Sequence, residues 1–337
     1  MNILLTGGAG YIGSHAAVVL TEAGHQVVIL DNFCNSQLSV LERLAKILGK
    51  PVPFVEGDTR DTELVRKILK NYKIDAVMHF AGLKAVGQSV QKPIDYFDNN
   101  VAGTISLLQA MRANNIKMLV FSSSATVYGA PQYLPLDENH PTQAINPYGR
   151  SKLHIEEILS DIEASDSNWH IACLRYFNPV GAHESGIIGE NPNDTPNNLM
   201  PYIAQVALGR LPYLNVYGND YDTLDGTGVR DFIHVMDLAE GHLAALSFIN
   251  QKSGLNIFNL GTGKGSSVLE MVKAFEGVSG KSIPLRVTNR RTGDVAACYA
   301  RVDKSSTDLS WKATRTIQEM CSSTLNFQKN YKCNNLS

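Results

Sequence analysis

The sequence of 337 residues lacks the features that mark several large classes of protein. Its net charge is only −2, so no basic surface is predicted and a nucleic-acid partner is not expected. No apolar run approaches the ~20 residues needed to cross a bilayer, so no membrane partner is expected either. The first predicted strand begins at Asn2, which leaves no room for a signal peptide. With 44% apolar residues, the composition is typical of a globular protein.

Cysteine is also scarce, and its spacing is uninformative. No two of the five cysteines have the C-x-x-C spacing of a metal or redox site. Free thiols in a reducing cytoplasm are the simplest interpretation, with no metal ion bound. The five are Cys34, Cys173, Cys298, Cys321 and Cys333.

The first half of the chain alternates short apolar runs with longer amphipathic segments. This alternation predicts an α/β fold with a doubly wound, Rossmann-type parallel sheet. Apolar runs that read as buried strands lie at 3–5, 27–30, 54–55, 77–80, 119–121 and 171–175. Helix-like segments lie near 11–23, 61–71, 99–113 and 148–164.

The second half has a different composition, because Asn, Pro and Gly become frequent from 178 to 230. Loops rich in turn-forming residues commonly shape a site on a rigid scaffold. Strand and helix signals return at 231–250, 255–260 and 266–278. We therefore expect a first domain over 1–177 and a smaller α/β lobe over 178–337, with elements near 231–250 packing back on the first domain.

A glycine-rich loop follows the first predicted strand and precedes a predicted helix. Gly7, Gly10 and Gly13 form the pattern G-x-x-G-x-x-G, which lets the backbone approach a pyrophosphate at the helix N-terminus. Asp31 ends the next strand, 24 residues after Gly7, where a carboxylate accepts hydrogen bonds from the adenosine ribose. Because this carboxylate would repel a 2′-phosphate, the sequence predicts NAD rather than NADP.

Two further strand ends carry polar residues. Asp58 follows the third strand, where it lines the cofactor site or only caps the next helix, and the sequence does not decide between these roles. His79 ends the fourth strand among apolar neighbours, so we expect a core histidine rather than a catalyst.

The catalytic candidates come from the fifth strand and the helix that follows it. Ser124 closes the strand, and the segment Asn146–Lys152 has an N-cap asparagine followed by proline. Tyr148 and Lys152 are then four residues apart on one helix face. A neighbouring ammonium and a positive nicotinamide would lower the pKa of the tyrosine, which otherwise is a poor base at neutral pH.

These motifs together resemble the extended short-chain dehydrogenase/reductase superfamily and, more closely, the UDP-galactose (UDP-glucose) 4-epimerases. The likeness extends from the first residues to about residue 300. The matching stretches are TGGAGYIGSH (6–15), DNFCNS (31–36), HFAGLKAVG (79–87), FSSSATVYG (121–129), LRYFNPVGAH (174–183), PNNLMPYIAQ (196–205) and GTGVRDFIHVMDLA (226–239).

The resemblance implies a role for each matching residue. The catalytic set would be Ser124, Tyr148 and Lys152. The NAD site would comprise Gly7, Gly10, Tyr11, Ile12, Gly13, Asp31, Asn32, Asn35, Ser36, Asp58, Phe80, Ala81, Lys84, Asn99, Ser122, Tyr148, Lys152 and Tyr176. The UDP-sugar site would comprise Lys84, Ser124, Tyr148, Asn178, Asn198, Leu199, Asn215, Tyr217, Arg230, Arg291, Asp294 and Cys298.

The implied reaction inverts C4 of a UDP-hexose by transient oxidation to a 4-keto sugar. Cys298 stands where glucose- and galactose-restricted relatives have a bulky tyrosine, so UDP-N-acetylglucosamine and UDP-N-acetylgalactosamine are expected substrates as well. Drift without functional effect is the other interpretation of that position. The resemblance also implies a homodimer that packs the helices near 99–113 and 148–164.

Two other functions share this scaffold. A sugar-nucleotide 4,6-dehydratase needs an acid–base pair, typically Asp-Glu, after the strand-end serine, whereas this chain has Ala125 and Thr126. A non-catalytic NAD sensor would tend to lose the tyrosine–lysine pair, which this chain retains. Both alternatives are therefore disfavoured.

Overall fold

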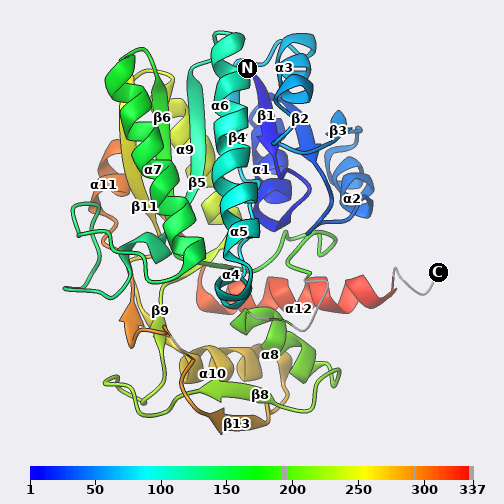
Figure 1. The fold of residues 1–337 in the computed structure, drawn as a ribbon. Coiled ribbons are helices and arrows are strands. Elements are labelled where there is room, and N and C mark those ends of the chain that lie inside the picture. Colours follow the sequence, from blue (N-terminus) through cyan, green and yellow to red (C-terminus); the bar gives the residue numbers. More distant parts are fainter. Residues whose placement is uncertain (192–195, 197, 292, 334–337) are drawn as a thin grey trace.

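The first lobe is built around a seven-stranded sheet in which every neighbouring pair is parallel (Figure 1). The computed structural model describes residues 1–191, 196, 198–291 and 293–333, and the side chains of Lys332 and Cys333 lie outside that description. The strand order is β11-β6-β5-β4-β1-β2-β3. The strands are β1 (Asn2–Thr6), β2 (Gln26–Asp31), β3 (Phe54–Glu56), β4 (Ala76–His79), β5 (Met118–Ser124), β6 (His170–Tyr176) and β11 (Gly254–Leu260).

Helices cover both faces of this sheet, because successive strand residues point to opposite sides. Ile3 and Leu5 of β1 belong to one apolar core, whereas Leu4 between them belongs to the other. The first face packs against α1 (Tyr11–Glu22), α2 (Ser39–Leu48) and α9 (Val235–Ile249). The second packs against α3 (Thr62–Asn71), α6 (Gly103–Ala113) and α7 (Pro147–Ser165). The doubly wound α/β sheet expected from the sequence is confirmed.

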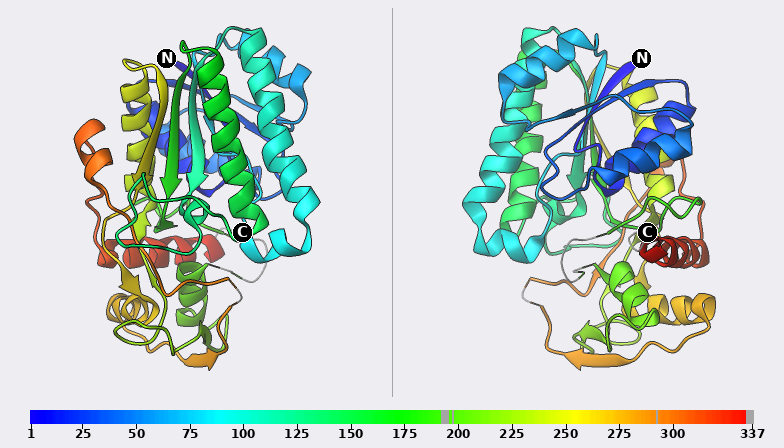
Figure 2. Two further views of the ribbon diagram at one scale, coloured as in Figure 1. Left: turned by 60° about the vertical axis from the view of Figure 1, so that its left-hand side comes forward. Right: turned by 90° about the vertical axis from the view of Figure 1, so that its right-hand side faces the viewer.

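The second lobe lies beyond the carboxyl ends of the strands, and α12 (Ile317–Cys333) runs between the two lobes (Figures 1 and 2). Its core joins α8 (Leu199–Ala207), α10 (Val268–Ser279) and α12. Its strands pair as β10-β7, β12-β9-β14 and β13-β8. They are β7 (Asn178–Val180), β8 (Leu214–Tyr217), β9 (Val229–Arg230), β10 (Phe232–His234), β12 (Ser266–Ser267), β13 (Leu285–Thr288) and β14 (Ala297–Cys298).

The boundary expected at residue 177 divides the sequence differently from the sheet. β11 comes from the expected second lobe, yet it pairs with β6 and completes the central sheet. α9 packs on the first lobe, as expected for elements near 231–250, and its Ala239 meets Ala16 and Val19 of α1. The chain thus returns to the first domain after forming part of the lobe, because β11 gains a strand partner and α9 covers an apolar sheet face.

Short helices complete the architecture. A π-helix (Phe97–Ala102) precedes α6, so the expected helix near 99–113 begins with a wider turn that carries Asn99. The others are α4 (Val86–Gln91), α5 (Pro93–Tyr96), a 3₁₀ helix (Ala125–Tyr128) and α11 (Asp303–Asp308). Among the helices of the described residues, none is long and apolar enough to span a membrane.

Candidate active site

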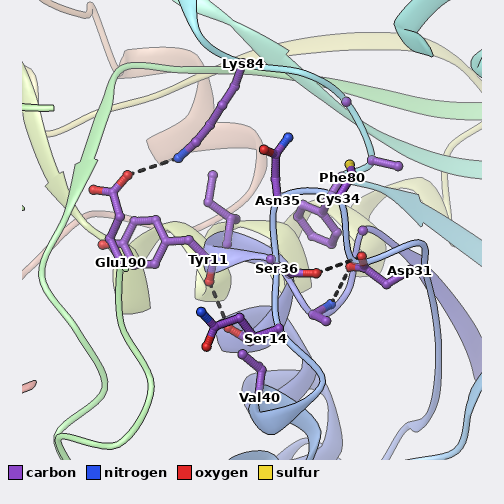
Figure 3. A pocket seen from close by; sticks show the side chains of 18 of the residues that line it. Tyr11, Ser14, Asp31, Cys34, Asn35, Ser36, Val40, Phe80, Lys84 and Glu190 are labelled. Atoms are coloured by element: carbon purple, nitrogen blue, oxygen red, sulfur yellow. Dashed lines mark hydrogen bonds and ion pairs between the residues drawn. The ribbon is translucent and has the colours of Figure 1, made fainter. Parts of the chain in front are cut away.

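A cavity of about 480 Å³ opens at the carboxyl ends of the strands, where the first lobe meets the second. Ligands bind at this edge in open parallel sheets because loops from several strands converge there. Figure 3 shows Asp31 on one side of the cavity and Lys84 and Glu190 on the other. The predicted site residues that line it are Gly7, Gly10, Tyr11, Ile12, Gly13, Asp31, Asn32, Asn35, Ser36, Asp58, Phe80, Ala81, Lys84, Asn99, Ser122 and Asn198.

The glycine loop has the shape of a pyrophosphate cradle. Gly7 has a positive φ of 68°, and a Cβ there would lie 2.7 Å from the backbone nitrogen of Ala81. A Cβ on Gly13 would lie 2.4 Å from the Gly7 carbonyl oxygen, so a side chain at either position would clash with backbone. Gly10 caps α1, and no side chain occupies that helix N-terminus. The exposed amides and the helix dipole therefore face the cavity and fit an anionic pyrophosphate.

Asp31 is held in place by three hydrogen bonds at the end of β2. Its carboxylate accepts from the backbone N–H groups of Ala9 (3.0 Å) and Phe33 (2.9 Å) and from the Ser36 hydroxyl (2.8 Å). A carboxylate has about four acceptor positions, so it keeps capacity for one ribose hydroxyl. This fixed negative charge fits NAD and disfavours a 2′-phosphate.

The structure excludes one of the two roles left open for Asp58, that of a helix cap. Asp61, rather than Asp58, caps α3 by accepting from the backbone N–H of Leu64. Asp58 instead lines the cavity and accepts from Asn32 (2.8 Å) and from Arg60 (2.8 Å). The hydrogen bond from Arg60 lowers the pKa of Asp58 to about 2, so this carboxylate stays ionised near neutral pH.

His79 is a core residue, as expected. Its ring nitrogens hydrogen-bond the hydroxyls of Thr6 (2.6 Å) and Thr104 (2.9 Å), and burial lowers its pKa to about 3. The His79 ring is neutral and only 2% exposed, and both of its nitrogens are in hydrogen bonds. It therefore has no free nitrogen for acid–base chemistry.

Ser124 and Tyr148 are brought together at the edge of the cavity. Ser124 ends β5, and its oxygen accepts from the backbone N–H (3.2 Å) and hydroxyl (2.9 Å) of Thr126. Its own hydroxyl proton is therefore directed elsewhere, and Ser124 hydrogen-bonds Tyr148. Tyr148 stands in the first turn of α7, whose N-cap Asn146 accepts from the backbone of Gly149 at 2.8 Å.

The electrostatics of Tyr148 differ from the expectation. We expected Lys152 to lower its pKa, but burial raises the pKa of Tyr148, opposed by the Ser124 hydrogen bond and the charge of Lys84. Lys152 acts elsewhere because its ammonium donates to the Ser122 carbonyl at 2.7 Å and lies 4.9 Å from the centre of the Phe121 ring. Burial lowers the pKa of Lys152 to about 8.

Four predicted site residues lie behind the cavity lining rather than in it. Lys152 and Tyr176 are buried, and both contact Ser122, which does line the cavity. Tyr148 lies close enough to the lining residue Lys84 to feel its charge, and Ser124 is the partner of Tyr148. A Cβ on Gly82 would lie 3.6 Å from the Lys152 ammonium, which places this lysine directly beneath the cavity wall.

Glu190 is a site residue that the sequence analysis missed. Its carboxylate accepts from the Lys84 ammonium at 3.0 Å and from the Asn198 amide at 2.6 Å, as drawn in part in Figure 3. Lys84 follows β4, whereas Asn198 caps α8, so one carboxylate joins the two lobes across the cavity. No local motif marks this residue, because its partner Lys84 is 106 positions away in sequence.

The remaining predicted substrate residues lie on the second lobe, outside the cavity lining. The Arg230 guanidinium lies 3.8 Å from the Asp294 carboxylate, and Arg291 stacks at 3.8 Å on the Tyr217 ring. The other predicted residues occupy nearby strands and the start of α8. Cys298 is paired with Arg230 in register, and Asn215 donates to Tyr202 at 3.2 Å. Asn178 begins β7, whereas Leu199 begins α8 and packs on the lobe core.

Comparisons with known proteins agree with this geometry. The UDP-glucose 4-epimerase of Bacillus subtilis (strain 168) is 54% identical over 328 residues, covering 97% of each chain. The structure of a UDP-glucose 4-epimerase from Stenotrophomonas maltophila with bound NAD and formylated UDP-arabinopyranose is 50% identical, covers 99% of both chains and has a TM-score of 0.97. The Bifidobacterium longum enzyme, in complex with NAD+ and UDP, is 52% identical, covers 98% of this chain and 99% of its own, and has a TM-score of 0.96.

The family assignment rests on the sequence as a whole as well as on these relatives. A sequence model of the NAD dependent epimerase/dehydratase family matches residues 3–261, which is more than half of the 337 residues. The match includes the glycine loop, Asp31 and the Tyr148–Lys152 helix turn. The chain belongs to the NAD dependent epimerase/dehydratase family.

Proposed function

We propose that this chain interconverts UDP-glucose and UDP-galactose with bound NAD, and that Ser124, Tyr148 and Lys152 are its catalytic residues. The observation that carries the proposal is the position of the Ser124–Tyr148 pair, beside Lys84 at the edge of a cavity whose far end has a pyrophosphate cradle. The near-complete alignment with UDP-glucose 4-epimerases supports the same activity.

Tyr148 acts as the base that exchanges a proton with the 4-hydroxyl of the sugar. Ser124 donates a hydrogen bond to Tyr148 because Thr126 occupies its acceptor positions, and this bond favours the phenolate. NAD, when bound in the cavity, would supply reversible hydride transfer at C4 of the sugar. Lys84 adds positive charge beside Tyr148, and Lys152 adds a further positive charge behind the cavity wall at Ser122, so both stabilise the developing negative charge.

The second lobe holds the nucleotide while the sugar turns. Arginine forks match phosphate oxygens, so Arg230 and Arg291 bind the diphosphate, with Asn198 at the N-terminus of α8. Asn178, Asn215 and Asp294 hydrogen-bond the uridine and sugar. Because most of the affinity comes from the diphosphate and uridine, the 4-keto sugar is free to rotate between the two hydride transfers.

The test is an NMR time course with UDP-galactose and no added NAD. The wild-type chain should form UDP-glucose, because net oxidation is zero and the cofactor is retained. Tyr148→Phe should lose about a thousandfold in kcat, the scale of a general base, while it still co-purifies with NAD. Full activity of Tyr148→Phe would contradict the assignment of the base, and no epimerisation by the wild type would contradict the function.

We further propose that the chain epimerises UDP-N-acetylglucosamine and UDP-N-acetylgalactosamine. Cys298 on β14 pairs with Arg230 and is only partly buried against the cluster that contains Tyr128 and Phe177. A cysteine is much smaller than the tyrosine of restricted relatives, so it leaves room for a 2-acetamido group.

Cys298→Tyr provides the test of this wider specificity. The variant should lose most of its kcat/KM on UDP-N-acetylgalactosamine and retain its activity on UDP-galactose, both followed by NMR. Cys173→Ala, a buried cysteine of β6 remote from the lobe, serves as the control. Equal loss of both activities in Cys298→Tyr would contradict the pocket argument.

We propose a homodimer formed through α6, α7 and the short helices before them. Apolar side chains are exposed on this surface: Ile94 is 80% exposed, Val90 63% and Ile105 40%. Such a patch is typical of an interface between copies. By light scattering, the wild type should have the mass of two chains and Ile94→Glu that of one. Leu224→Glu, at a still more exposed site of the second lobe, should remain dimeric.

We also propose a cytoplasmic location. The four cysteines whose side chains are described, Cys34, Cys173, Cys298 and Cys321, are all free thiols. Thiols persist in a reducing compartment, which supports the proposal. Fractionation of cells that express the tagged full-length chain would test it.

A further inference from the structure

A chain of buried hydrogen bonds runs from the cavity wall into the core. Ser122 lines the cavity, and its hydroxyl hydrogen-bonds the hydroxyl of Tyr176. The same Tyr176 hydroxyl hydrogen-bonds Nε2 of His242 on α9, and Nδ1 of that ring lies 2.8 Å from the Leu238 carbonyl oxygen. The three side chains are between 1% and 7% exposed, so water does not compete for these bonds.

The direction of every bond in this chain follows from its inner end. A carbonyl oxygen only accepts, so Nδ1 of His242 carries a proton and donates to Leu238. In the neutral ring Nε2 then has a lone pair, and it accepts the single proton of Tyr176. Because Tyr176 has no other proton, the Ser122 hydroxyl donates to Tyr176.

Burial keeps the two ionisable side chains in this series of hydrogen bonds, Tyr176 and His242, neutral. It lowers the pKa of His242 to about 4 and raises that of Tyr176 well above its usual value of 10. The ring of His242 also lies 4.9 Å from the ring of Phe80, which lines the cavity and limits rotation of the imidazole. Near neutral pH the hydrogen bonds from Ser122 through Tyr176 and His242 to Leu238 therefore have a single arrangement of their protons.

We propose that His242 is a positioning residue that makes the Ser122 oxygen a hydrogen-bond acceptor toward the cavity, where it selects the N–H donor of the nicotinamide carboxamide. Ser122 and Ser124 lie two positions apart on β5 and therefore point to the same side of the sheet, at the catalytic end of the cavity. The adenine amino group belongs to the opposite end, near Asp31. The inference rests on the assignment of NAD to this cavity.

The consequence is a fixed orientation of the nicotinamide carboxamide. A carboxamide has one donor side and one acceptor side, so an acceptor-only partner determines which way it turns. Rotation of the carboxamide about its bond to the ring is thereby restricted. His242 thus influences the cofactor from behind the cavity wall, without touching it.

The experiment measures how the full-length chain partitions between NAD and 3-acetylpyridine adenine dinucleotide. In this analogue a methyl group replaces the amino group of the carboxamide, so the N–H donor is absent and the carbonyl is kept. The chain is exchanged into an equimolar mixture of both, and the retained nucleotides are quantified by chromatography. One buried neutral hydrogen bond corresponds to a preference of about three- to tenfold for NAD.

Ser122→Ala and His242→Phe should each lower the NAD-to-analogue ratio by about three- to tenfold relative to wild type. In His242→Phe the Tyr176 proton turns toward Ser122, and the serine proton turns toward the cavity. The effect of His242→Phe should vanish in the Ser122→Ala background, because the two residues act through one bond. Thr104→Val, which removes a hydrogen bond from another buried histidine, His79, is the control and should leave the ratio unchanged.

The outcomes separate the parts of the argument. Equal ratios in wild type, Ser122→Ala and His242→Phe would overturn the proposal while leaving NAD as the cofactor. Additive effects in the double variant would overturn it as well, because they indicate general damage to the core. Retention of neither dinucleotide by the wild type would overturn both the proposal and the cofactor assignment.

Discussion

The two sides of the cavity hold their functional groups in different ways. On the cofactor side, the groups are backbone atoms and buried side chains that are fixed before any ligand arrives, such as the Gly7–Gly13 loop and Asp31. On the substrate side, they are more exposed side chains that bind one another: Glu190 accepts from Lys84 and Asn198, and Arg230 faces Asp294.

This difference matches what each ligand has to do. A cofactor that is retained through every turnover is best held by rigid, preorganised groups, which cost no reorganisation on binding. A substrate that enters, turns and leaves needs groups that can exchange partners. Under the proposed function, the ion pairs of the substrate side would be exchanged for contacts with an anionic substrate, whereas Asp31 and the glycine loop would keep their contacts.

Gly13→Ala should have the largest effect if the cofactor side is rigid. The new Cβ would lie 2.4 Å from the Gly7 carbonyl oxygen and 2.7 Å from Gly8 Cα, so backbone has to move. We expect a loss of about 2 to 4 kcal/mol in the free energy of unfolding, together with loss of bound NAD. Urea denaturation and the absorbance of released nucleotide measure the two effects.

Gly277→Ala is the matched control, since this glycine also lies within a helix, α10, but has open space around it. It should be neutral or stabilising by up to about 1 kcal/mol. If Gly13→Ala behaved like Gly277→Ala, the glycine loop would be adaptable, and the comparison between the two sides would fail.

Lys152→Met should raise stability while it abolishes activity, because the cofactor side holds a buried charge. Burial lowers the pKa of Lys152 from 10.5 to about 8, so the folded state binds this proton less tightly than the unfolded chain does. Wild-type stability should therefore rise between pH 8 and 10.5, and the variant should lack that rise. At pH 7 we expect the variant to gain about 1 to 3 kcal/mol.

Denaturation at pH 7 and at pH 10 measures this difference, and the exposed Lys67→Met is the control, with a change near zero. A Lys152→Met variant that is less stable than wild type at pH 7 would show that the hydrogen bond to Ser122 outweighs the cost of burying the charge.

Glu190→Gln should have the smallest effect, on the substrate side. Removal of this negative charge frees Lys84 and Asn198 for an anionic ligand, so UDP should bind about two- to fivefold more tightly. The gain is modest because the Lys84 side chain is 59% exposed and its charge is screened. Calorimetry of UDP binding tests this, with Glu157→Gln on the exposed face of α7 as the charge-matched control. Weaker binding by Glu190→Gln would mean that the carboxylate positions the ligand instead of competing with it.

Local sequence was sufficient for the sheet and for much of the cofactor side. Strand and helix periodicity predicted the parallel sheet, and the glycine spacing placed the turn at the end of β1 because only glycine tolerates such close backbone contact. Asp31 could also be predicted, because it is the last residue of its strand. The start of α7 was recognisable from Asn146 and Pro147, which are good residues for a helix start.

The missed features depend on contacts between distant segments. The periodicity of 255–260 indicated a strand, but not that β11 would pair with β6 in the first domain. The helices α2 and α12 were not anticipated, although α12 supplies Phe327 and Tyr331 to the cavity wall. The direction of Lys152, toward Ser122 rather than Tyr148, follows from how α7 packs against β5 and has no counterpart in the spacing of Tyr148 and Lys152.

The sequence by itself determined the parallel sheet, the dinucleotide loop and the residue types needed for a proton and hydride exchange, because each depends on neighbours within a few positions. Only the tertiary structure decided which charges act on Tyr148, which carboxylate joins Lys84 to Asn198, and which way the Ser122 hydroxyl points. These depend on pairs as far apart as 66 and 106 residues, which meet only when the lobes and helices pack. Burial then keeps Tyr176 and His242 neutral, because water is no longer present to offer an alternative partner.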